Sequence, residues 1–94
     1  MNEWTWEYDP DAEHVVGDLP SDAKARVESL AQRLADAAAV KYLAEPPIED
    51  SGVSGIKDHA EGRIILWFLE HRRLRLILVL RVQFWPPERE DSIR

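Results

Sequence analysis

The chain has 94 residues, with 18 Asp and Glu against 12 Lys and Arg, a formal net charge of −6 and no cysteine. This length fits one domain with a modest core, and the acidic balance argues against a general nucleic-acid binder. The missing cysteine excludes disulfides and thiolate metal sites. Since we find no signal-peptide pattern and no apolar run long enough to span a bilayer, we expect a cytoplasmic protein without membrane contact.

The first residues predict a strand with one buried side. Residues 3–8 alternate strictly, which places Trp4, Trp6 and Tyr8 on one face and polar side chains on the other.

Two helices are predicted next. Asp9 is a plausible N-cap and Pro10 suits the first helical position, and the apolar residues that follow recur at helical spacing. Ser21 is a second N-cap candidate, before a long amphipathic helix over residues 22–43. Residues 44–55, AEPPIEDSGVSG, carry two prolines and two glycines and predict a loop.

The remainder predicts a sheet. Residues 63–69 and 74–84 read as two strands joined by a turn at 70–73, and residues 53–59 as a shorter strand alongside. The even-numbered residues of 74–84 are all apolar, so we expect that face to lie under the helices.

The expected hairpin register has a geometric consequence. If Leu69 pairs with Leu74, Arg63 pairs with Leu80 on the apolar face, and only a β-bulge would turn Arg63 toward Arg81.

These elements predict an α+β domain over residues 1–85. Its two layers follow the order β-α-α-β-β-β, with two helices packed on one face of an antiparallel-rich sheet and the other face open. Residues 86–94, PPEREDSIR, are charged and begin with prolines, and we expect a frayed tail there.

Charge is uneven along the chain. Residues 1–50 contain four Lys and Arg against twelve Asp and Glu, whereas residues 51–85 contain six against three. A basic surface, if present, should therefore belong to the second half.

The order of elements, the helix pair in YDPDAEHVVGDLPSDAKARVESLAQRL and the late Gly-Arg-aliphatic strand before a hairpin resemble the RelE/ParE superfamily of toxins from bacterial type II toxin-antitoxin systems. The resemblance covers residues 3–85 and is closest to the YoeB/RelE ribonucleases. Glu45 in AEPP and Arg63 stand where those enzymes carry a catalytic glutamate and arginine. The segment LRVQFW resembles their terminal Arg-Tyr-His-Tyr segment.

The resemblance implies a toxin that cleaves messenger RNA on the ribosome without a metal. The ribose 2′-OH attacks the neighbouring phosphate, which requires a base, an acid and cations for the developing charge. Gln83 and Phe84 replace the His and Tyr of YoeB-like members, and neither transfers a proton usefully near neutral pH. RelE-like members use a cluster of cations instead, and Lys57 and His59 occupy about that stretch and would share one face of a strand.

The predicted site is a phosphate-binding concavity on the open sheet face. The alternatives are that Lys57 and His59 are solvated edge-strand residues, and that Arg63 forms a structural ion pair with Glu61 or Glu45. No cofactor is expected, and the spacing of the three histidines suggests no metal site. The predicted catalytic residues are Glu45, Lys57, His59, Arg63 and Arg81, and the predicted RNA-binding residues are Arg75, Gln83 and Trp85.

Three functions remain open. The first is the messenger RNA endonuclease, whose partners would be the ribosome, messenger RNA and a cognate antitoxin. The second is a non-nucleolytic binding module on the same fold, either a ParE-like gyrase toxin or a degenerate member kept for its antitoxin contacts. The third is an unrelated α+β protein that forms a homodimer through a Trp-rich surface.

Overall fold

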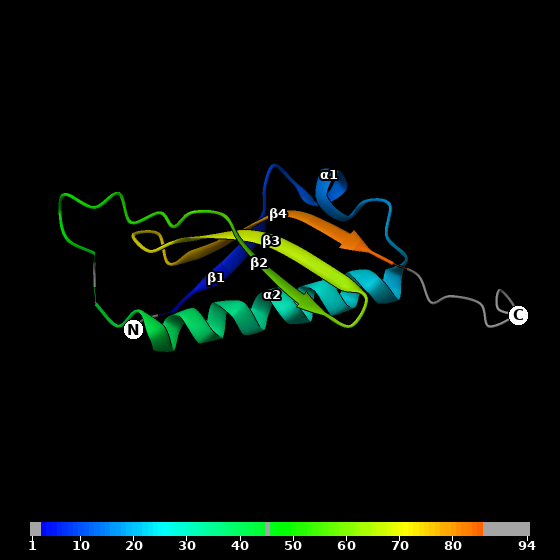
Figure 1. Cartoon of the computed structure of the whole chain (residues 1–94), viewed down its shortest axis with the longest axis horizontal. Coiled ribbons are helices and arrows are strands. Elements are labelled where there is room, and N and C mark those ends of the chain that lie inside the picture. Colours follow the sequence, from blue (N-terminus) through cyan, green and yellow to red (C-terminus); the bar gives the residue numbers. More distant parts are fainter. Residues whose placement is uncertain (1–2, 45, 86–94) are drawn as a thin grey trace, which may run out of the picture.

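The computed structural model describes residues 3–44 and 46–85, and its elements follow the predicted β-α-α-β-β-β order (Figure 1). They form a small α+β domain with two helices and a four-stranded mixed sheet. The predicted tail, residues 86–94, lies outside the described residues. The elements are β1 (Thr5–Tyr8), α1 (Ala12–Val16), α2 (Ser21–Lys41), β2 (Lys57–Glu61), β3 (Ile64–His71) and β4 (Leu76–Phe84).

The strands lie in the order β1-β4-β3-β2. β1 is parallel to β4, whereas the β2–β3 and β3–β4 pairs are antiparallel. The chain therefore starts at one edge of the sheet, crosses through both helices and re-enters at the other edge. The sheet is mostly antiparallel, as expected.

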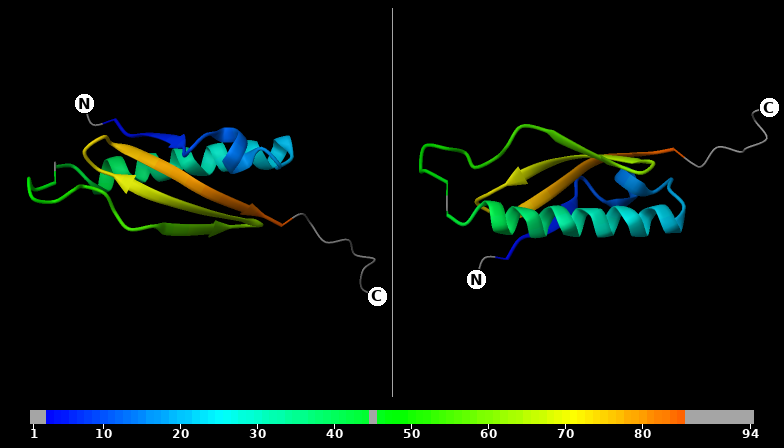
Figure 2. Two further views of the ribbon diagram at one scale, coloured as in Figure 1. Left: turned by 90° about the horizontal axis from the view of Figure 1, so that it is seen from above. Right: turned by 60° about the horizontal axis from the view of Figure 1, so that its bottom comes forward.

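The helix starts differ slightly from the prediction. The N-cap of α1 is Asp11 rather than Asp9, because its carboxylate accepts a hydrogen bond of 2.9 Å from the His14 backbone N–H. α2 begins at Ser21 and runs along the sheet (Figures 1 and 2). The buried stripe of α2 consists of Ala23, Val27, Leu30, Ala31, Ala35 and Ala38. Neither helix in the described ranges has the length and apolar character that a membrane span requires.

One core fills the space between the helices and the inner face of the sheet. Small alanines on α2 let the helix approach the strands closely, and Trp4 closes the core beside β1. The inner face presents Ile64, Leu66 and Phe68 from β3 and Ile77 and Val79 from β4.

The predicted β3–β4 register is wrong. The turn occupies residues 72–75 rather than 70–73, and Leu69 pairs with Leu78 rather than with Leu74. Arg75 adopts a left-handed φ of 53°, and its N–H donates a 3.2 Å hydrogen bond to the Arg72 carbonyl, which closes the turn.

The prediction of which face of β4 lies under the helices is also only partly right. Ile77 and Val79 face the core, so the even-numbered residues at the start of β4 lie on the open face. Both faces of this strand are apolar, and hydrophobic alternation therefore does not fix which one is buried.

A β-bulge in β4 then reverses the alternation. Phe68 pairs with Val79 but Trp67 pairs with Arg81, which leaves Leu80 as the extra residue. Beyond the bulge Val82 and Phe84 pack on the core, as the sequence predicts for that end.

Candidate nucleic-acid interface

The β2–β3 turn brings Arg63 and Trp85 together. Gly62 occupies the first turn position with φ 61°, which glycine adopts without strain, and Arg63 the second. The Trp85 N–H donates a 2.9 Å hydrogen bond to the Arg63 carbonyl, which extends the β3–β4 ladder by one step. Arg63 therefore lies opposite Trp85 at this end of the sheet.

The neighbouring rows of the sheet place two more predicted residues on the open face. Gln83 pairs with Ile65, and Arg81 pairs with Trp67. The guanidinium carbon of Arg81 lies 5.2 Å from the centroid of the Trp67 ring, within cation–π range. The bulge is what places Arg81 on the side away from the helices, and therefore on the same face of the sheet as Arg63.

These side chains are available to a ligand. Arg63 is exposed, and its side chain forms no hydrogen bond or ion pair with any other described residue. The ion pair with Glu61 weighed from the sequence is therefore absent, and Glu45, the other suggested partner, lies outside the described residues. Trp85 is 43% exposed. A hollow of about 230 Å³ beside Arg81 is lined by Ile56, Trp67 and Leu80.

Lys57 and His59 share a face, as predicted, but it is not the open face. Lys57 pairs with Phe68 and His59 with Leu66, both of which point toward the helices. The His59 Nε2 atom lies 3.4 Å from a carboxylate oxygen of Glu61. The structure therefore separates these two residues from Arg63 and Arg81. The pairing of β2 with β3 decides which face Lys57 and His59 occupy, and alternation along the sequence does not.

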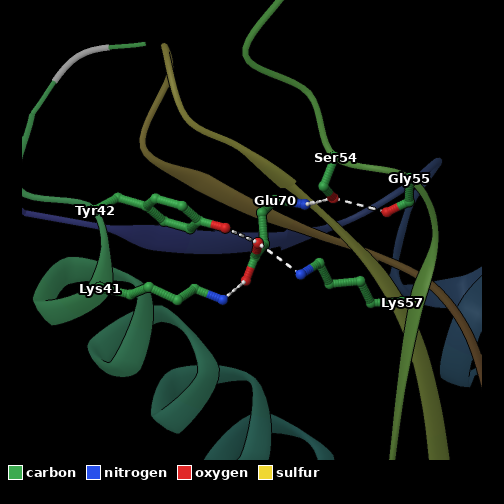
Figure 3. A network of polar contacts seen from close by, with 6 residues as sticks. All are labelled: Lys41, Tyr42, Ser54, Gly55, Lys57 and Glu70. Atoms are coloured by element: carbon green, nitrogen blue, oxygen red, sulfur yellow. Dashed lines mark hydrogen bonds and ion pairs between the residues drawn. The ribbon is translucent and has the colours of Figure 1, made fainter.

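Lys57 belongs instead to a network around Glu70 (Figure 3). Glu70 lies on the inner face with its side chain only 6% exposed. Its carboxylate accepts hydrogen bonds from the Tyr42 hydroxyl at 2.7 Å and from Lys41 at 3.0 Å, and Lys57 Nζ lies 3.3 Å away. Burial alone would raise the pKa of Glu70, but these hydrogen bonds and charges outweigh it and leave the pKa below its ordinary value.

The same network holds the long connection between α2 and β2. The Glu70 N–H donates to the Ser54 hydroxyl oxygen at 2.9 Å, and that hydroxyl donates to the Gly55 carbonyl at 2.7 Å. Arg73 in the β3–β4 turn donates to the carbonyls of Pro47 and Asp50. These contacts are structural, since they join the connection to β3 and to the turn.

The remaining predicted residues lie elsewhere. Arg75 sits in the β3–β4 turn, at the opposite end of the sheet from the β2–β3 turn (Figure 1). Its carbonyl accepts a 3.0 Å hydrogen bond from the Thr5 N–H, which places Arg75 beside the start of β1 and not with Arg63, Arg81 and Trp85. Glu45 has no described position.

Two residues of this face were missed from the sequence. Trp67 lies in a strand whose two faces are both apolar, so the neighbouring residues do not indicate that its side chain lies on the open face. Asp58 pairs with Trp67 on β2 and places an exposed carboxylate in the same row as Arg81. Within the described ranges no group of three or more His, Asp or Glu side chains is arranged to hold a metal ion.

No family model matches the chain, and neither a curated protein nor a solved structure matches it. The likeness to RelE/ParE toxins therefore rests on the sequence motifs and on the order of the elements.

Proposed function

We propose that this protein is a toxin of the RelE/ParE kind that binds messenger RNA on the open sheet face beside the β2–β3 turn and cleaves it on the ribosome without a metal. The observation that carries the proposal is the placement of three residues on that face: Arg63 lies opposite Trp85, and Arg81 lies on β4, two rows of the same face away.

The chemistry of this cluster suits a single RNA strand. Guanidinium groups bind phosphate through paired N–H donors, and an exposed indole stacks on any base. Gln83 lies between the two arginines in the register, and its amide can both donate to and accept from a base edge.

Cleavage would use the two arginines for charge stabilisation. As the 2′-oxygen bonds to phosphorus and the bond to the 5′-oxygen breaks, negative charge builds on the phosphoryl oxygens, where Arg63 and Arg81 would bind. The proton of the 2′-OH must go to a base. Asp58 is the carboxylate in the row of Arg81, and we propose it for that role. The departing 5′-oxygen takes its proton from water, and the Asp58 carboxyl returns its proton to the solvent.

A translation reaction followed by primer extension on the messenger tests this function. The proposal predicts cuts within codons in the decoding site that disappear with Arg63→Ala. Thermal stability should not change, because the Arg63 side chain contacts no described partner by hydrogen bond or ion pair. Arg75→Gly is the matched control, since it removes a cation at the far end and glycine accepts the left-handed φ of 53° there. An intact messenger with the wild-type chain would refute cleavage.

A second candidate is a binding module that does not cut RNA. It is favoured by the placement of Lys57 and His59 on the inner face, away from the proposed site. Among the described residues in the two cross-strand rows that contain Trp67 and Gln83, Asp58 is then the one side chain able to transfer a proton. This candidate predicts inhibited translation or inhibited gyrase supercoiling without any new RNA ends.

The proposed antitoxin would cover the apolar part of the open face. Large apolar side chains there are only half-buried, and a contiguous surface of this kind marks a protein contact. A purified chain that is monomeric and monodisperse over a wide concentration range without a partner would count against an antitoxin, and a stable dimer would assign the face to a second copy. The face includes Ile65, Trp67, Leu69, Leu76, Leu78 and Leu80.

A further inference from the structure

A groove of about 300 Å³ lies between α2 and the β2–β3 turn, on the other side of that turn from the open face. Arg26, Ser29 and Arg33 line one wall, and Glu61 and Gly62 line the other. The three residues on α2 recur at positions i, i+3 and i+7, and they therefore lie along one side of the helix.

The groove carries more positive than negative charge. Arg33 donates a 2.7 Å hydrogen bond to Glu61 through one Nη atom, and this bond holds the pKa of the Glu61 carboxyl below its ordinary value. The Arg26 guanidinium and the Ser29 hydroxyl have no hydrogen-bond or ion-pair partner among the described residues. Two guanidinium groups thus face one carboxylate, and most of their donors remain for an oxyanion.

The groove and the open-face residues Arg63, Arg81 and Trp85 adjoin at the β2–β3 turn. Gly62 forms part of its wall, and the next residue, Arg63, belongs to the cluster. A Cβ atom at Gly62 would meet no other atom within 4 Å, so the backbone of the turn is uncrowded. A nucleic-acid backbone can therefore pass close to the turn from one side to the other.

We infer that this groove binds a backbone phosphate of the same RNA strand, which would pass from the open face around the Gly62–Arg63 turn to Arg26 and Arg33. The inference rests on the proposed function and extends its RNA contact beyond the sheet. A phosphate fits the groove better than a protein segment does, because the free groups on its walls are hydrogen-bond donors. The Arg33–Glu61 pair would weaken as the phosphate takes over part of the guanidinium.

Fluorescence anisotropy with a short labelled oligouridine over a salt series tests the inference. Each phosphate contact to a single strand contributes about 0.7 to the slope of log affinity against log salt. Arg26→Ala should therefore lower that slope by about 0.7 and weaken binding. Lys24→Ala removes a cation from the same helix outside the groove, and should leave the slope unchanged. Glu61→Gln should strengthen binding, because it removes the carboxylate and frees Arg33.

The outcomes separate the groove from the proposed function. If Arg26→Ala and Lys24→Ala behave alike while Arg63→Ala weakens binding, the groove inference is wrong and the open-face proposal survives. If the wild-type chain binds no oligouridine, RNA binding itself is refuted and the groove inference is refuted with it. A weaker complex with Glu61→Gln would also overturn the groove inference.

Discussion

Replacing Glu70 with glutamine measures how strongly the buried carboxylate stabilises the fold. Its side chain is 6% exposed and contacts Tyr42, Lys41 and Lys57. A charge-assisted hydrogen bond contributes about 1.5–3 kcal/mol, which we assign to the Tyr42 contact. The two lysines are 50% and 41% exposed, so solvent screens them, and each adds about 0–1 kcal/mol.

The expected loss for Glu70→Gln is about 1–3 kcal/mol, because glutamine keeps a neutral hydrogen bond with Tyr42 but loses the charge that strengthens it and attracts the lysines. For a domain of this size that lowers the melting temperature by roughly 5–20 °C. Circular dichroism at neutral pH measures it, with Glu61→Gln as the control for an exposed carboxylate paired to Arg33. Equal melting temperatures for the two variants would refute the reasoning.

The pH dependence of this difference has a defined sign. Because the folded-state pKa of Glu70 lies below the ordinary value of 4.5, its stabilisation is complete above pH 4.5 and is lost as the pH falls through the folded-state pKa. The gap between wild type and Glu70→Gln should therefore be constant near neutrality and close in acid. A gap that widens below pH 4.5 would contradict the pKa assignment.

Two further predictions concern the RNA-facing end and the long connection. Trp85→Ala should weaken oligouridine binding by about 1–3 kcal/mol through lost base stacking, measured by anisotropy, and unchanged affinity would remove Trp85 from the interface. Gly52→Ala should destabilise the fold by about 1–3 kcal/mol in urea unfolding. Gly52 has φ 82°, and a Cβ there would lie 3.0 Å from the Arg73 side chain. Gly55→Ala is its control, because a Cβ at that position meets nothing within 4 Å, and equal losses would show that the φ of Gly52 is unimportant.

The order of elements could be predicted because local patterns determine it. The alternation around Trp4 and Trp6 predicts β1, and the helical spacing before Lys41 predicts α2. Each pattern involves only residues that are close in the chain. The β3–β4 register could not be predicted, since both faces of each strand are apolar and any register buries enough surface.

The candidate site depended on features with no local signal. The bulge at Leu80 puts Arg81 on the same face of the sheet as Arg63, and nothing in the sequence around Leu80 marks the bulge. The face of Lys57 follows from its pairing with Phe68. The Glu70 network joins residues that are distant in the chain, so it emerges only from tertiary structure.

The central claim is that RNA binds at the Arg63 end of the open sheet face, and NMR with a ¹⁵N-labelled chain tests it most directly. Titration with a short oligouridine should shift the backbone amides of Arg63, Arg81 and Trp85 and the indole N–H of Trp67, while Arg75 at the opposite end stays unchanged. Shifts confined to Lys57 and His59 on the inner face, or to the β3–β4 turn, would contradict the account, as would a spectrum that RNA leaves unaltered.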